Sequence, residues 1–322
     1  MFKDLEELKE EIRQGKSNEQ IINERLQYLN SQEYRESRKK SVRKDGTMQI
    51  AFYDGFIPDD EVVGITGGRI SDFAYFCDEK NIYNSLIDLI RENMDKNGYN
   101  FAFLCETVRG YFNKKVDSDY NDVLEYLEQF QTEKRPYFIR ETLPYIIYDY
   151  TNSHFEGSLI DFAKGFMCHE YHSIRNSEPN GEELTERYLQ SLNENIEEVQ
   201  ELCVLPISSI KGLNFAACTE YSMLTQNCLA FLGYETYLMG GTITKGEKTE
   251  GHNFNVIKVK NRETYSIVDE AQMVAFKDIP IRDINHFSSA KIIKSLDGQE
   301  LVYTVFPEVK KSLNDKLSDV EH

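Results

Sequence analysis

One helix followed by a pair of strands, within residues 212–272, constrains the fold more than any other part of the sequence. Residues 212–217 lead into Cys218, apolar residues then recur at helical spacing, and Gly233 ends the run in the manner of a C-cap glycine. The apolar residues are Tyr221, Leu224, Cys228, Phe231 and Leu232. The pattern predicts that Cys218 lies in the first turn of a buried helix. There, free N–H groups and the positive end of the helix dipole favour a thiolate over a thiol.

Two antiparallel strands are predicted at residues 252–259 and 265–269, after a shorter strand at 234–238 and a polar loop at 245–251. If the turn between them is centred on residues 260 and 261, His252 lies directly opposite Asp269, with Cβ atoms roughly 4.5–5.5 Å apart. Apolar residues share their face, and we expect the cysteine helix to cover it. The apolar pairs are Phe254 with Ile267 and Val256 with Tyr265, and the other face carries Asn253, Asn255 and Ser266.

Cys218, His252 and Asp269 are the residue types that nucleophilic catalysis at an acyl bond needs. A thiolate attacks, an imidazole carries protons to and from the thiol and the leaving amine, and a carboxylate fixes the tautomer and orientation of the ring. The alternative is a buried cysteine beside an unrelated His–Asp hydrogen bond. Placement at a helix start and across one strand pair favours the catalytic interpretation.

This segment resembles the core of the transglutaminase-like superfamily. In that family a cysteine begins a helix, a glycine ends the helix ahead of a strand, an HAWN-type strand follows, and a second strand ends in aspartate. The matching residues here are Cys218, the junction Leu232-Gly233-Tyr234, Gly241, the run His252-Asn253-Phe254-Asn255, and Ile267-Val268-Asp269. The sequence departs from the family in having Phe254 where Trp is usual, and Glu270-Ala271 where Pro-Thr is common after the aspartate.

The resemblance implies an α+β fold with a papain-like core, in which the cysteine helix packs on an antiparallel sheet and an amide acyl group is taken onto the cysteine. Water as acceptor gives hydrolysis of a peptide or amide, and an amine gives acyl transfer, as in transglutaminases and the related arylamine acetyltransferases. We expect hydrolysis, because it needs no second binding site. The third interpretation is a binding or scaffold protein with an inert triad. No cofactor is implied.

An oxyanion hole is expected at the start of the cysteine helix. The backbone N–H of Cys218 is one expected donor, and Asn214 is near enough in sequence to be considered as the second. A helix-capping role for Asn214 is the alternative.

The rest of the chain predicts a mainly helical N-terminal region at residues 1–135 and a catalytic domain at 136–322. The charged turn Glu133-Lys134-Arg135-Pro136 marks the expected boundary. Helices are expected at residues 2–14, 18–40, 80–96, 100–114, 119–132 and 182–203, with a small β segment near 47–70. The last of these helices would bury a stripe formed by Leu189, Leu192, Ile196, Val199 and Cys203.

Charge limits the partners that the chain can bind. With 55 acidic and 37 basic residues, the formal charge is −18, which disfavours nucleic acid and anionic membranes as partners of the whole surface. A short basic run at residues 38–44 is interpreted as the solvated end of a charged helix. A peptide or protein is the expected substrate, and the helical N-terminal region is a candidate surface for a protein partner.

The sequence also indicates a compartment. Its hydropathy predicts neither a signal peptide nor a membrane-spanning stretch. The six cysteines are scattered and include no CxxC pair, which indicates reduced thiols in a cytoplasm. No metal site is predicted, because Cys168, His169 and His172 lack the spacing of a zinc motif and fit a polar helix end or loop. The absence of Trp and the abundance of Asn, Lys, Ile and Tyr indicate an AT-rich bacterial genome.

Overall fold

The structure is a computed structural model of the chain. It describes all residues except 1–3, 43–49, 67–71, 95–100, 114–117, 131–137, 193–202, 215, 259–263, 273, 281–290, 295–299, 310 and 313–322. The fold is mixed α+β with an antiparallel sheet, which confirms the predicted class. Across the described residues, none of the helices combines the length and apolar character needed to cross a bilayer.

Two compact units interleave along the chain. The first comprises Met1–Thr66, Tyr75–Tyr111 and Ala216–His322, and the second comprises Gly67–Ala74 and Phe112–Phe215. This division differs from the two consecutive domains expected, and the expected boundary at residues 133–136 lies outside the described residues. The segment that carries the predicted chemistry therefore shares its unit with the N-terminal part of the chain.

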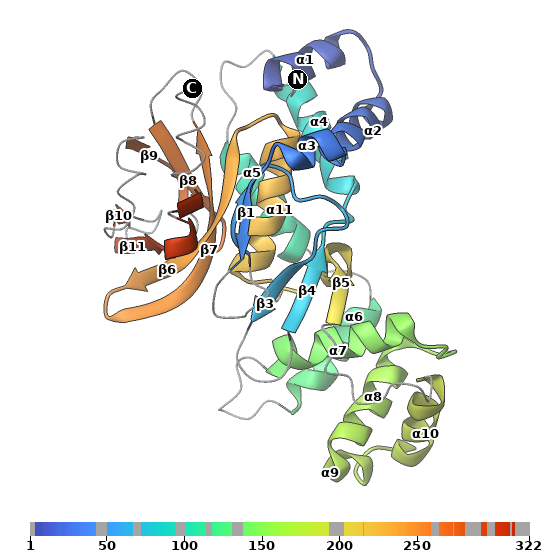
Figure 1. Cartoon of the computed structure of the whole chain (residues 1–322). Helices are drawn as coiled ribbons and strands as arrows, with labels where there is room; N and C mark the ends of the chain where they lie inside the picture. The colour runs from blue at the N-terminus through green and yellow to red at the C-terminus, as the bar shows by residue number, and fades with distance from the viewer. Residues whose placement is uncertain are drawn as a thin grey trace. The chain divides into compact units, whose positions relative to one another are not determined.

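An antiparallel sheet dominates the first unit (Figure 1). Its strand order is β1-β2-β6-β7-β8-β9, and β6 also pairs with β11, which pairs with β10. The strands are β1 (Lys40–Val42), β2 (Ile50–Asp54), β6 (Thr236–Lys245), β7 (Lys248–Lys258), β8 (Thr264–Asp269), β9 (Val274–Pro280), β10 (Lys291–Lys294) and β11 (Glu300–Val305). Along one side of β6, β2 pairs with its first half and β11 with its second half, while β7 follows the whole of its other side. Three short strands lie outside this sheet: β3 (Val63–Thr66), β4 (Asp72–Phe76) and β5 (Cys203–Pro206).

Strands β6 and β7 form a longer hairpin than predicted. They pair from Thr236 opposite Ile257 to Lys245 opposite Lys248, around a turn in which Gly246 has a φ of 57°. The polar loop expected at residues 245–251 is therefore wrong. This end of the hairpin is largely exposed, so its residues lack the apolar alternation by which a strand is recognised.

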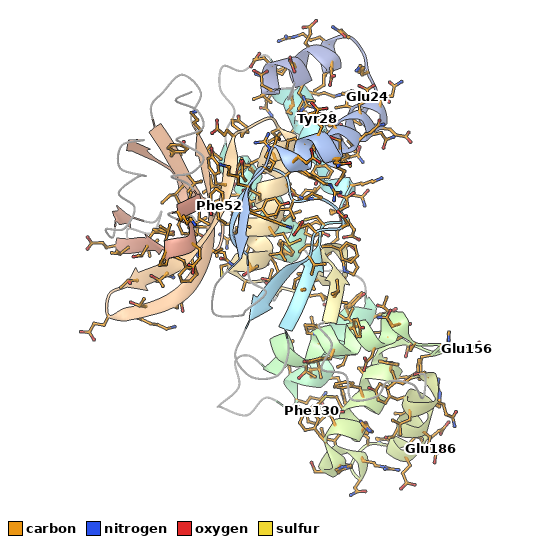
Figure 2. The ribbon with its side chains drawn as sticks, viewed as in Figure 1. Glu24, Tyr28, Phe52, Phe130, Glu156 and Glu186 are labelled. Carbon is orange, nitrogen blue, oxygen red and sulfur yellow. The ribbon has the colours of Figure 1, made fainter. Side chains whose placement is uncertain are left out.

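The two faces of the sheet differ in chemistry. One face packs into an apolar core formed by Ala51, Phe52, Tyr237, Met239, Ile243, Phe254, Val256, Tyr265, Ile267, Leu301, Tyr303, Val305 and Val309. Phe52, labelled in Figure 2, stacks on Tyr237 with ring centroids 5.7 Å apart. The other face lies against helix α11 (Cys218–Phe231), which runs beside β6 and β7 in Figure 1. The expectation that the cysteine helix covers the apolar face is therefore wrong.

Hydrogen bonds join α11 to the polar face of the sheet. The Nδ2 atom of Asn253 donates to Oγ1 of Thr219 at 2.7 Å, and Nδ2 of Asn255 donates to Oε1 of Gln226 at 2.9 Å. Gln226 in turn accepts from the hydroxyl of Thr236 at 2.9 Å and donates to two backbone carbonyls at 2.7 and 3.0 Å. All these side chains are buried. Because buried polar groups need partners, this layer fixes the position of α11 on the sheet.

Helix α11 begins and ends as predicted. Cys218 is its first residue. At the other end Gly233 has a φ of 92°, and the N–H groups of Gly233 and Tyr234 donate to the carbonyls of Ala230 and Leu229, both at 3.0 Å. This is the Schellman motif, in which a glycine adopts the left-handed conformation and satisfies the last carbonyls of the helix. The motif leads the chain directly into β6.

The N-terminal residues support α11 from outside the sheet. Arg25 is buried and donates to the carbonyl of Phe231 at 2.9 Å, and Asn227 of α11 bonds both the N–H of Ile57 (2.7 Å) and its carbonyl (3.0 Å). The helices in the first 113 residues are α1 (Leu5–Arg13), α2 (Asn18–Leu29), α3 (Gln32–Glu36), α4 (Asn81–Asn93) and α5 (Phe101–Asn113). They confirm the predicted helices, except that the second is divided into α2 and α3 and ends before β1. The basic run consequently includes a residue of β1, Lys40, and is not the end of a helix.

The second unit is mainly helical. Its helices are α6 (Ser118–Glu128), α7 (Phe138–Asn152), α8 (Leu159–Glu170), α9 (His172–Arg175), α10 (Gly181–Ser191) and the 3-10 helix η1 (Ile207–Ile210), and α8 contacts α6, α7, α9 and α10. The long helix expected at residues 182–203 is confirmed only as far as Ser191, where α10 ends. Leu192 is extended, Leu189 is 44% exposed and Cys203 begins β5, whereas residues 196 and 199 lie outside the described residues. His169 and His172 stand at helix ends, as predicted.

Candidate active site

The structure brings the predicted Cys218, His252 and Asp269 together within the first unit. Nε2 of His252 lies 2.6 Å from Oδ2 of Asp269, and the His252 ring also hydrogen-bonds the Cys218 thiol. His252 is 5% exposed and Asp269 is 1% exposed, whereas Cys218 is half-buried. Because Asp269 engages Nε2, Nδ1 is the ring nitrogen that remains for the thiol. Cys218, His252 and Asp269 thus form one chain of contacts.

The strand register differs from the prediction by two residues. Asn255 pairs with Val268 and Val256 with Ile267, so that Asp269 falls opposite Phe254 and diagonal to His252. An even shift keeps every side chain on its predicted face, and diagonal neighbours remain within reach of long side chains. The predicted contact therefore survives an incorrect register. Because β8 ends at Asp269, His252 extends beyond the β7–β8 pairing.

The surroundings of His252 favour the protonated form of its ring. Burial lowers the pKa of its ring, but the hydrogen bonds to Asp269 and Cys218 and the charges of both residues outweigh burial and raise the pKa to about 10. A protonated ring between a carboxylate and a thiol is the arrangement that stabilises a thiolate. The stability that the protonated His252 ring contributes to the folded state is fully present below about pH 6.5 and is lost as the pH rises through about 10.

Tyr303 on β11 is a further member of the site that sequence reasoning missed. Its hydroxyl donates to Oδ2 of Asp269 at 2.6 Å, and the backbone N–H of Gln272 donates to Oδ1 at 3.2 Å. The carboxylate thus accepts hydrogen bonds from three segments of the chain. Tyr303 follows Asp269 by 34 residues and reaches it only because β11 pairs with β6. No local spacing in the sequence signals that pairing.

The oxyanion-hole role of Asn214 stays a prediction. It is exposed, has a φ of 57°, and donates its backbone N–H to the carbonyl of Phe112 at 3.0 Å. It belongs to the second unit, whereas Cys218 belongs to the first. The capping alternative is wrong, because the N-cap residue of α11 is Ala217, whose N–H is bound by Glu220 at 2.9 Å.

A second buried carboxyl, Glu270, follows Asp269 directly after the end of β8. It is 1% exposed, and the Cys105 thiol lies 3.6 Å from its Oε1. Burial raises the pKa of Glu270 to about 7 and raises that of Cys105 as well. The sequence signal that could have pointed to Glu270 is a charged residue at the position where the transglutaminase-like superfamily commonly has proline.

We expect Glu270→Gln to remove a pH-dependent loss of stability. The stability contributed by a carboxyl with a raised pKa is complete below about 4.5 and is lost as the pH rises through about 7. Across that range, the free energy of unfolding of the wild type should fall relative to the variant by on the order of 3 kcal/mol. Urea unfolding at a series of pH values measures the difference. Glu300→Gln, an exposed control, should follow the wild type, and parallel curves for wild type and Glu270→Gln would refute the prediction.

Comparison with known proteins gives no relative for this arrangement. The chain matches no protein-family model, no curated protein and no solved structure. Within the described residues, no three His, Cys, Asp or Glu side chains gather as ligands of a metal ion. The resemblance to the transglutaminase-like superfamily therefore stays an expectation based on the residues of the site.

Proposed function

We propose that this protein is a cysteine hydrolase of transglutaminase-like, papain-like fold that cleaves peptide or amide bonds through an acyl-thioester on Cys218. The observation that carries the proposal is the buried contact of 2.6 Å between His252 and Asp269, with the thiol of Cys218 hydrogen-bonded to the same ring. Cys218 also begins α11, whose first N–H groups have no partner within the helix.

The first half of the reaction uses the charges of the site directly. The Cys218 thiolate attacks the carbonyl carbon, a C–S bond forms, and the carbonyl electron pair moves to oxygen. When this intermediate collapses, the C–N bond breaks and the His252 imidazolium gives its proton to the leaving amine. Asp269 keeps the ring oriented throughout. The backbone N–H of Cys218 is the expected donor to the oxyanion.

The second half returns the enzyme to its starting state. The neutral His252 ring takes a proton from water, the hydroxide attacks the thioester, and the C–S bond breaks to release a carboxylic acid and the thiolate. An amine in place of water would give acyl transfer by the same steps. Hydrolysis is favoured because it requires no site for a second substrate.

A library of peptides and simple amides, with and without an added primary amine, tests the proposal. We expect the wild type to release new carboxylic acids and amines, and Cys218→Ala to lose the activity by roughly 10³-fold or more. Cleavage that persists unchanged in Cys218→Ala would remove the cysteine from the mechanism. Products that carry the added amine would instead identify the protein as a transferase.

A further inference from the structure

We infer that Tyr303 is a positioning residue of this site, whose hydroxyl shares Oδ2 of Asp269 with His252 and so sets the basicity and orientation of the His252 ring. The catalytic consequence of this role rests on the proposed function. The contact itself does not, because it is a feature of the folded chain. Two hydrogen bonds of 2.6 Å, one from Nε2 of His252 and one from the Tyr303 hydroxyl, meet at the same oxygen.

The surroundings of Tyr303 keep its hydroxyl in place. The side chain is fully buried in the apolar core, its ring packs edge-on against Phe254 with centroids 5.0 Å apart, and it lies 6.1 Å from the ring of His252. Burial and the charge of Asp269 raise the pKa of the Tyr303 hydroxyl far above neutral pH. The hydroxyl therefore remains protonated and acts as a constant donor.

Strand pairing explains why a residue so late in the chain reaches the triad. Tyr303 pairs with Ile243 of β6, and Val305 pairs with Gly241 of the same strand. Gly241 pairs in turn with His252 on the other side of β6. His252 and Tyr303 thus stand on two strands that flank β6, with their side chains on the same face, and both reach the end of β8 where Asp269 lies.

Sharing one carboxylate oxygen has a defined effect on His252. Hydrogen bonds to an ionised oxygen are among the stronger ones in proteins, and each donor draws on the same negative charge. If the Tyr303 hydroxyl is removed, the charge of Oδ2 acts on the imidazolium alone, and the His252 pKa rises. The ring then gives up its proton less readily and is less available as the base that the deacylation step requires.

The other titratable groups near this oxygen are few and can be held constant. Cys218 interacts with the His252 ring, whereas Glu270 and Cys105 interact electrostatically with Asp269. None of these groups is altered by a substitution at position 303. A shift in the titration of His252 therefore reports the hydroxyl itself.

The test is an NMR titration of the His252 ring in the full chain, comparing wild type, Tyr303→Phe and Tyr265→Phe. Tyr265 is a matched control, since it is a buried tyrosine of the same apolar core on β8. We expect the His252 midpoint to move upward by about 0.5–1 pH unit in Tyr303→Phe and to stay in place in Tyr265→Phe. An unchanged midpoint in a folded Tyr303→Phe protein would overturn the inference.

A second variant keeps the inference testable if Tyr303→Phe does not fold. Incorporation of a fluorinated tyrosine at position 303 keeps the ring and strengthens the donor, so the His252 midpoint should move downward, and an unmoved midpoint would contradict the inference. The peptide and amide library separates the two proposals. A shifted midpoint together with turnover that does not depend on Cys218 would retain the positioning role and remove the hydrolase, whereas Cys218-dependent turnover with no shift would do the reverse.

Discussion

We expect the replacement of His252 with alanine to slow the alkylation of Cys218 by iodoacetamide roughly 10–10²-fold near neutral pH. The reason is electrostatic. His252, whose pKa is raised to about 10, is the positive charge that bonds the thiol, and alanine removes both the charge and the hydrogen bond. Only a thiolate reacts at a useful rate, so the loss appears directly in the rate constant. Peptide mapping of the adducts over time measures it for each cysteine.

Exposure must be separated from activation in this experiment. Cys218 is half-buried, whereas Cys77, Cys168 and Cys228 are buried, so preferential labelling of Cys218 alone would say little. Dependence on His252 is the decisive comparison. His169→Ala, which changes an exposed histidine at the end of α8, should leave the rate at Cys218 unchanged. A Cys218 rate that is equal in the wild type and His252→Ala would remove His252 as its activating group.

Gly241→Ala is expected to destabilise the protein by about 3 kcal/mol or more. A Cβ atom at this position would lie 1.8 Å from the carbonyl oxygen of Thr304 and 2.8 Å from its carbon. These are backbone atoms of β11, so a change of side-chain rotamer cannot relieve the clash. The strand itself must move. Because β11 carries Tyr303 and β7 carries His252, the site should be disturbed together with the fold.

A matched glycine provides the control for this prediction. Gly251 lies on the neighbouring strand β7, is exposed, and has no atom within 4 Å of the Cβ that alanine would add. Gly251→Ala should change the free energy of unfolding by less than about 1 kcal/mol. Urea unfolding of both variants gives the comparison. Equal stability for Gly241→Ala and Gly251→Ala would mean that β11 does not approach β6 as closely as described.

The sequence predicts the local parts of the site well, because local chemistry determines them. Cys218 begins a helix, and Gly233 is the left-handed residue that ends it. His252 and Asp269 meet because alternation along a strand fixes the face of each side chain. The register is wrong by two residues because the turn between the strands cannot be located from composition, yet an even error leaves the face unchanged.

The face on which α11 packs could not be predicted from polarity alone. Asn253 and Asn255 alternate with apolar residues, which is the pattern of a strand with one solvated face. They are buried instead, because α11 presents polar groups, among them Thr219 and Gln226, that bond them. A binary pattern does not distinguish a polar residue bonded to water from one bonded to another buried side chain.

Residues far apart in the sequence were beyond local reasoning. Tyr303 depends on the pairing of β11 with β6, and the N-terminal support of α11 depends on contacts such as that of Arg25 with Phe231. Neither leaves a signal in residues 212–272. For this reason the sequence predicts an N-terminal region that is separate from the chemistry, although its strands β1 and β2 belong to the same sheet.

Direct observation of an acyl group on Cys218 is the measurement that tests the proposed mechanism most closely. The protein is mixed with p-nitrophenyl acetate, an activated acyl donor, and the release of nitrophenolate is followed while samples are quenched for mass spectrometry. We expect a rapid burst equivalent to the enzyme present, an acetyl group on Cys218 that disappears as water attacks, and neither signal in Cys218→Ala. A burst of the same size in Cys218→Ala, or acetyl groups spread over lysines with none on Cys218, would contradict it.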